Sequence, residues 1–112
     1  MKTLYVTDLD GTLLGSDERT SGFTNQTVNG LVQKGMLFSY ATARSYVTAK
    51  KVTRGLDAHI PLIVYNGGML AKVTGEILYS KEMLPADALL AMEEGVKRGV
   101  TLCIWSKGKL YG

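Results

Sequence analysis

The hydrophobic and polar positions of this chain predict short strands that alternate with amphipathic helices. Apolar runs bounded by glycine, asparagine or proline predict strands at 4–6, 36–41, 62–65, 69–73, 76–79, 100–105 and 109–111. Apolar residues spaced three and four apart predict helices at 24–34, 43–56 and 85–98. Helices between the first three predicted strands favour right-handed crossovers and a parallel sheet. Asn66-Gly67 and Thr74-Gly75 predict two antiparallel hairpins after the third strand. The pattern therefore predicts an α/β fold.

One apolar stripe on each predicted helix is expected to be buried. These stripes are Val28, Leu31 and Val32, then Tyr46, Val47 and Val52, then Leu89, Leu90 and Val96. Thr24 is expected to cap the first helix and Gly35 to end it, and Pro85 suits the first turn of the third helix, which Gly99 ends. The strand at 4–6 is expected to be buried.

The segment LYVTDLDGTLL, residues 4–14, ends an apolar run in two carboxylates. Alternate strand residues point to the same side, so Asp8 and Asp10 are expected to project together at the carboxyl end of the strand, where open α/β sheets place ligands. Gly11 permits a sharp turn, and Thr12 adds a hydroxyl. Two close carboxylates favour a bound cation such as Mg²⁺, with one acid as nucleophile and the other as acid and base. An ordinary turn is the alternative, and the residues alone leave both readings open.

Three segments in order carry a resemblance to a known family. DLDGTLL after LYVT, YATAR at 40–44 and NGG at 66–68 resemble motifs of the haloacid dehalogenase superfamily, specifically its Cof-type sugar-phosphatase branch. Ala43 stands where many relatives have glycine, and Gly68 where many have alanine. The resemblance implies that Asp8 is the phosphate-accepting nucleophile, that Asp10 is the general acid and base, that both contribute to a Mg²⁺ site, and that Thr42 binds the transferring phosphoryl group.

Further residues around these motifs are candidates for binding substrate phosphate. The full set is Gly11, Thr12, Thr42, Ala43, Arg44, Asn66 and Gly67. Thr42 has an alternative role as the cap of the helix predicted at 43–56. Arg44 has two alternative roles: it binds the substrate phosphate, or it pairs with a carboxylate as a structural clamp. Asn66 has an alternative role as a turn residue alone.

The resemblance implies a partial doubly wound, Rossmann-like core at residues 1–80, followed by the beginning of an α+β cap at 81–112. The implied activity is Mg²⁺-dependent hydrolysis of small phosphomonoesters, such as sugar phosphates, through an aspartyl-phosphate. The family's lysine motif and later acidic cluster have no match here, so the chain resembles the N-terminal part of a longer enzyme. A fragment that binds or oligomerises without turnover is the alternative function, and a receiver-type phosphoacceptor is a weaker one.

Composition narrows the partners. The net charge is +3 with thirteen scattered basic residues, which disfavours nucleic-acid binding and is compatible with a small phosphorylated metabolite. One cysteine and one histidine exclude a disulfide framework and a conventional zinc site within the chain. Cys103 is expected to be a buried thiol. A membrane span and a signal segment are not predicted, so a cytoplasmic location is expected. Unpaired strand edges predict self-association.

Overall fold

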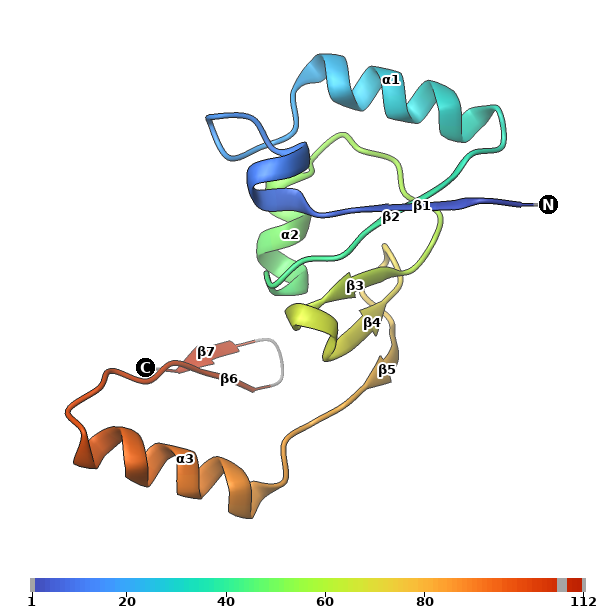
Figure 1. The fold of residues 1–112 in the computed structure, drawn as a ribbon. Helices are drawn as coiled ribbons and strands as arrows, with labels where there is room; N and C mark the ends of the chain where they lie inside the picture. Colours follow the sequence, from blue (N-terminus) through green and yellow to red (C-terminus); the bar gives the residue numbers. More distant parts are fainter. Residues whose placement is uncertain (1, 107–108, 112) are drawn as a thin grey trace. The chain divides into compact units, whose positions relative to one another are not determined.

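The computed structural model describes residues 2–106 and 109–111. The chain forms two compact units, residues 1–80 and residues 81–112 (Figure 1). Among the described residues, none of the helices is both long enough and apolar enough to span a membrane.

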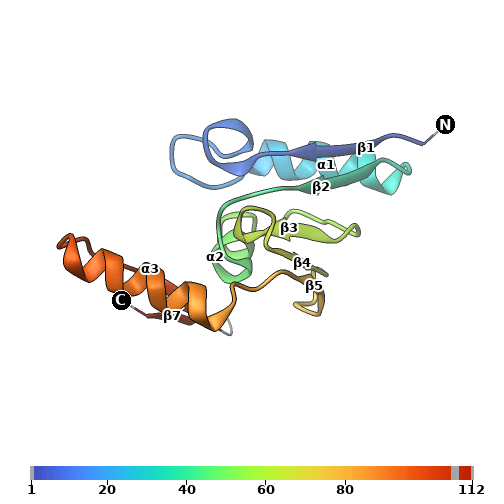
Figure 2. The ribbon, with the colours of Figure 1, turned by 60° about the horizontal axis from the view of Figure 1, so that its bottom comes forward.

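Parallel pairing organises the first unit. Strand β1 (Leu4–Thr7) pairs in parallel with β2 (Leu37–Tyr40), and Figures 1 and 2 both show the two strands side by side. Strand β3 (Leu62–Val64) joins this pair through a parallel bridge between Ala41 and Ile63. The α/β fold with a parallel sheet is therefore confirmed, because each of the first two crossovers contains a helix.

Two hairpins extend the first unit beyond β3. Strand β4 (Met69–Ala71) runs antiparallel to β3, and β5 (Ile77–Ser80) runs antiparallel to β4. Gly75 adopts a φ of 96° between β4 and β5, in the left-handed region that glycine tolerates best. Both predicted hairpins are confirmed.

Helix α1 (Gly22–Gln33) begins earlier than the sequence pattern predicts. The Ser21 hydroxyl oxygen accepts a hydrogen bond of 3.0 Å from the backbone N–H of Thr24. Ser21 is therefore the cap, and the prediction of Thr24 as the cap is wrong. Val28 and Val32 pack against the core as expected, but Leu31 is exposed.

Helix α2 (Tyr46–Val52) is only seven residues long, much shorter than the predicted helix at 43–56. The Ser45 hydroxyl accepts a bond of 3.2 Å from the N–H of Thr48, so the helix begins after Ser45 and residues 43–45 form a loop. Tyr46 and Val52 pack against the core, whereas Val47 is 59% exposed and the prediction that it faces inward is wrong. A helix of two turns has room for only a narrow buried stripe.

The core of the first unit lies between the helices and the strands that follow β1. Its fully buried members include Leu9, Tyr40, Leu62 and Val64. By contrast, Tyr5 in β1 is 56% exposed, and its neighbours in the strand are similarly open, so the prediction of a buried first strand is wrong. Within the described residues β1 pairs with β2 alone, and therefore one strand edge and much apolar surface of β1 face solvent.

The second unit consists of helix α3 (Pro85–Lys97) and a hairpin of β6 (Ile104–Ser106) and β7 (Lys109–Tyr111). Pro85 lies in the first turn of α3, as predicted, and Gly99 has a φ of 65° just after its end. The predicted strand at 100–105 begins later, at Ile104. The turn predicted at 107–108 lies outside the described residues. That this unit begins a cap stays a prediction.

Several burial predictions in the second unit are wrong. The predicted stripe is open to solvent, with Leu89, Leu90 and Val96 all more than half exposed. Cys103 is exposed as well. The reason lies in how α3 packs: its buried residue is Gly95, which lies against the side chain of Leu102. A unit this small has too little interior to bury a full helix stripe.

Candidate active site

Backbone hydrogen bonds bring the carboxyl ends of β1, β2 and β3 together at one edge of the sheet. The N–H of Ala41 donates to the carbonyl of Thr7 at 2.9 Å, and the N–H of Thr42 donates to the carbonyl of Ile63 at 2.9 Å. The segments that follow these three strands therefore meet at the same edge, which is where parallel sheets place their ligands.

The two aspartates lie in a turn directly after β1. Asp8 and Asp10 are exposed, and Leu9 between them is fully buried, so the alternation expected from a strand persists beyond its end. The Asp8 Oδ1 accepts a bond of 2.8 Å from the N–H of Leu9. A bond of 3.0 Å from the N–H of Leu14 to the carbonyl of Leu9 closes the turn, within which Gly11 has a φ of 77°.

Asp10 forms a two-pronged ion pair with Arg44, from the loop after β2. The Arg44 Nε lies 2.8 Å from Asp10 Oδ2, and its Nη2 lies 2.7 Å from Oδ1. The hydrogen bond from Arg44 holds the pKa of the Asp10 carboxyl below its usual value, against a smaller effect of desolvation. Asp10 is therefore a carboxylate at neutral pH. Of the two roles left open for Arg44, the carboxylate clamp is the one present in this structure.

Glu18 contributes to the electrostatics of this pair. The pKa of Arg44 is raised chiefly by its bond to Asp10, and the negative charge of Glu18 raises it further. Glu18 has a φ of 59° in the loop between the aspartate turn and α1, where its N–H donates to the carbonyl of Gly15 at 2.9 Å. The sequence showed only an acidic residue in a polar loop, so its effect on Arg44 was not foreseen.

Thr42 is 4% exposed, and its hydroxyl is oriented by a neighbouring backbone group. Its Oγ1 accepts a bond of 3.1 Å from the N–H of Arg44. Because the oxygen acts there as an acceptor, the hydroxyl hydrogen is available to donate to an anion. Thr42 does not cap α2, since Ser45 does. Serine and threonine are both preferred at the start of a helix, so the residue types alone did not decide between Thr42 and Ser45.

Asn66 is tied to Thr42 through the backbone. Its N–H donates to the Thr42 carbonyl at 2.9 Å, and the N–H of Tyr65 donates to the Arg44 carbonyl at 2.9 Å. Tyr65 and Asn66 have φ values of 51° and 57°, and two successive non-glycine residues in the left-handed region store backbone strain. Asn66 thus belongs both to the hairpin between β3 and β4 and to the edge that carries Thr42.

The remaining candidates lie on the surface of the same three segments. Gly11, Thr12, Ala43 and Gly67 are all exposed. The structure therefore gathers all the predicted residues onto the segments after β1, β2 and β3, while their roles stay predictions.

The side chains of the described residues do not by themselves fit a Mg²⁺ site. Both carboxylate oxygens of Asp10 bind Arg44, and one oxygen of Asp8 binds the N–H of Leu9. In the described part of the chain, acidic, histidine and cysteine side chains nowhere form a group of three that could hold a metal ion. Mg²⁺ takes six oxygen ligands, several of them usually water, so with Asp10 paired to Arg44 the Asp8 carboxylate is a single side-chain ligand at this edge.

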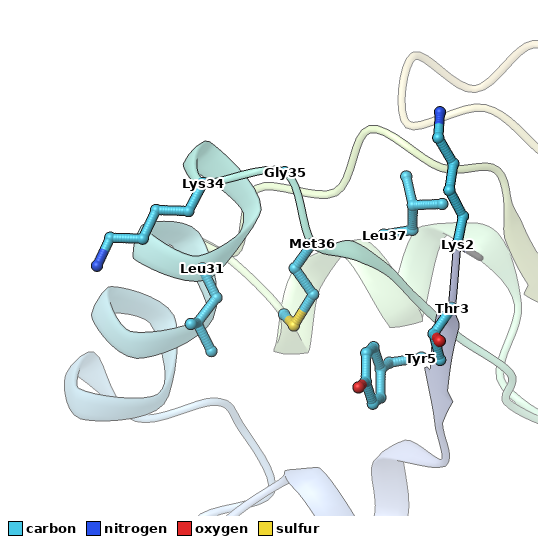
Figure 3. Close-up of a pocket in the computed structure, with 8 residues that line it drawn as sticks. All are labelled: Lys2, Thr3, Tyr5, Leu31, Lys34, Gly35, Met36 and Leu37. Atoms are coloured by element: carbon cyan, nitrogen blue, oxygen red, sulfur yellow. The ribbon is translucent and has the colours of Figure 1, made fainter.

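A pocket also opens at the opposite ends of β1 and β2. Figure 3 shows Leu31, Met36 and Tyr5 around it, whereas the amino groups of Lys2 and Lys34 point away. It lies at the amino ends of the strands and lacks an inward-pointing charge. The carboxyl edge with Asp8 is therefore the better candidate for chemistry.

Comparison with known proteins identifies the family. The model for haloacid dehalogenase-like hydrolases matches residues 5–112. This chain belongs to that family. The resemblance inferred from the three motifs is confirmed, and with it the assignment of the chain to a family of hydrolases.

Curated relatives of this family member include the HMP-PP phosphatases of Yersinia enterocolitica and Serratia proteamaculans. Each is 34% identical over 87 residues, which cover 78% of this chain. The matched residues make up 32% and 31% of those proteins, so the chain spans about a third of their length.

Solved structures of the family show the same fold. BT1666 from Bacteroides thetaiotaomicron, solved in a study of phosphatases of the superfamily, has a TM-score of 0.82 at 17% identity and is matched over 98% of this chain and 41% of its own. TM0651 from Thermotoga maritima has a TM-score of 0.80 at 24% identity, over 99% of this chain and 42% of its own. At these identities the likeness establishes the fold alone.

Proposed function

We propose that the carboxyl edge of the sheet hydrolyses small phosphomonoesters through an aspartyl-phosphate on Asp8. The observation that carries the proposal is the meeting of three loops at this edge: the turn with Asp8, the loop with Thr42 and the hairpin with Asn66, joined by backbone hydrogen bonds. Membership of a hydrolase family with phosphatases among its relatives supports the same reaction class.

In the first step an Asp8 carboxylate oxygen attacks the phosphorus, and the bond from phosphorus to the alcohol oxygen breaks. Thr42 contributes a hydroxyl donor for the phosphoryl oxygens, and the exposed backbone around Ala43 and Gly67 adds N–H donors. In the second step water attacks the phosphorus, which releases inorganic phosphate and restores the Asp8 carboxylate. Each step transfers one proton: the leaving oxygen gains one, and the attacking water loses one.

Asp10 is the proposed carrier of that proton. Its pairing with Arg44 keeps it a carboxylate in the free protein, and the carboxylate is the form that accepts a proton from water in the second step. The first step needs a protonated Asp10, and the ion pair disfavours that state. The proton donor role therefore requires that Arg44 release Asp10 during the reaction.

Magnesium dependence is part of the proposal. The Asp8 carboxylate is the proposed attachment point, and water and the substrate phosphate would supply further oxygen ligands. Calorimetric titration of these 112 residues with Mg²⁺ should show at most weak binding. Tight binding would contradict this expectation and show that further oxygen atoms of the chain complete the site.

The decisive experiment compares Asp8→Asn with Asp17→Asn. Asp17 is an exposed acid whose ion pair is with Arg19, so its variant makes the same charge change outside the turn that contains Asp8. The protein is mixed with an aryl phosphate and Mg²⁺, quenched in acid and digested, and mass spectrometry locates covalent phosphate, while released phenol gives the rate. At a Mg²⁺ concentration high enough to offset its weak binding, the unaltered chain and Asp17→Asn should carry phosphate on the peptide that contains Asp8.

Asp8→Asn should lose the adduct and at least about a hundredfold in rate, because an amide is a poor nucleophile. Circular dichroism should show an unchanged fold, since the asparagine oxygen can still accept from the N–H of Leu9. If the variant keeps more than about a tenth of the rate, which is ~1.4 kcal/mol of barrier, Asp8 is not the nucleophile. Phosphate on another residue would contradict the proposal in the same way.

A further inference from the structure

The Arg44 guanidinium lies at the carboxyl edge of the sheet, the proposed phosphate site, yet its partner there is the Asp10 carboxylate. Its backbone is held on both sides: the N–H donates to the Thr42 hydroxyl at 3.1 Å, and the carbonyl accepts from the N–H of Tyr65 at 2.9 Å. The Arg44 side chain is 24% exposed and that of Asp10 is 52% exposed. The side chain can therefore rotate about a fixed backbone, within reach of the space beside Thr42.

The pair with Asp10 is an exchangeable one. Water competes with an ion pair as exposed as this, so the pair is weaker than its short distances suggest. A phosphate group presents two oxygens to the guanidinium in the same fork geometry as a carboxylate, and a phosphate dianion carries twice the charge. A phosphoryl group bound next to Thr42 is therefore the stronger partner.

We propose that Arg44 exchanges partners at this edge: it holds Asp10 in the free protein and transfers to the phosphoryl group when an anionic substrate binds. The transfer needs only side-chain rotation, because the backbone bonds of Arg44 to Thr42 and Tyr65 stay in place. It releases the Asp10 carboxylate when substrate is present and withholds it otherwise. This inference rests on the proposed function, since it takes this edge as the phosphate site.

Inorganic phosphate is the probe, and NMR of the ¹⁵N-labelled 112-residue chain is the first measurement. The Nε–H signal of Arg44 is assigned by its loss in Arg44→Lys. Addition of phosphate should shift this signal with the same midpoint as the backbone amides of residues 42–44. Saturable shifts of those amides with an unmoved Arg44 signal would overturn the exchange, while the phosphate site itself would stand.

A double-mutant cycle provides the second measurement, with phosphate affinity as the readout. Asp10→Asn removes the competing carboxylate and should tighten phosphate binding about threefold or more. Asp8→Asn also removes a negative charge from this turn, but Asp8 lies beside the phosphorus and is not the partner of Arg44, so its gain reports direct repulsion and should be the same with and without Arg44. In an Arg44→Gln background the gain from Asp10→Asn should fall, whereas the gain from Asp8→Asn should not.

The outcomes separate the two claims. If the gain from Asp10→Asn persists in full without Arg44, the Asp10 effect is general charge repulsion and the exchange is overturned. If phosphate binds to none of the variants and causes no shifts at 42–44, the phosphate site fails, and the proposed function fails with it. Because the NMR titration uses the unaltered chain, poor folding of Arg44→Gln would leave the inference testable.

Discussion

Replacement of Thr42 by valine should weaken phosphate binding and stability together, and replacement by serine should affect stability alone. Valine has nearly the same shape as threonine but lacks the hydroxyl that accepts from the N–H of Arg44 at 3.1 Å. The loss of that acceptor in a site only 4% exposed should cost about 1 kcal/mol of unfolding free energy. Serine keeps the hydroxyl and loses one buried methyl group, which should also cost about 1 kcal/mol.

The two Thr42 variants are therefore expected to lose similar stability, and they differ in whether a side-chain hydroxyl is present to donate to phosphate. For a unit of the size of residues 1–80, about 1 kcal/mol corresponds to roughly 4–8 °C in melting temperature. Loss of a hydrogen bond to a charged phosphate should weaken phosphate binding about tenfold or more in Thr42→Val. Thr42→Ser should stay within about twofold of the unaltered chain.

The assays are thermal unfolding by circular dichroism and phosphate titration by NMR, well below both melting temperatures. Equal phosphate affinity of the two variants would refute the reasoning, because the hydroxyl would then contribute nothing to the anion. A melting temperature unchanged in Thr42→Val would show that the N–H of Arg44 finds another acceptor at no cost.

Asn66→Gly should keep or raise stability, whereas Asn66→Ala should be about 1 kcal/mol less stable than Asn66→Gly, because φ is 57° at this position. Both variants should weaken phosphate binding. Equal unfolding free energies of the two variants would contradict the assignment of backbone strain. Arg44 lowers the pKa of Asp10 from its ordinary value of 3.8, so their pair stabilises the fold above that pH and is lost as the pH falls below it. The unfolding free energy of the unaltered chain should exceed that of Asp10→Asn by at most about 1 kcal/mol at pH 7, and this difference should shrink by pH 3. A difference in urea unfolding that stays constant with pH would argue against the stabilising pair. The open edge of β1 should make the chain self-associate with rising concentration in light scattering, and Tyr5→Lys should reduce this; a monomer at all concentrations would show that the edge is protected.

Local pattern was enough to predict which segments become helices and strands, and where the hairpins turn. Gly75 lies at a left-handed φ where the sequence placed a turn, and Pro85 begins a helix as its missing N–H favours. The three motifs also identified the family, because each is a short run of consecutive residues that can be recognised without the fold. These features depend on neighbours in sequence, and a single chain displays them directly.

Burial and pairing were decided by the tertiary structure. Tyr5 reads as a core residue, but it is exposed because β1 has a strand on one side only within the described residues. Cap positions shifted since Ser21 and Ser45 compete successfully with Thr24 and Thr42 for the helix starts. Such choices depend on which hydroxyl reaches which N–H in three dimensions, and spacing alone does not separate them.

The partner of Arg44 illustrates this division most directly. The sequence placed an arginine two residues after Thr42 and left two partners open for it, because both a phosphate and a carboxylate fit a guanidinium fork. Asp10 lies 34 residues earlier in the chain, and only the parallel pairing of β1 with β2 brings the two loops to one edge. An ion pair between residues so distant in sequence follows from strand order, which is a property of the folded sheet.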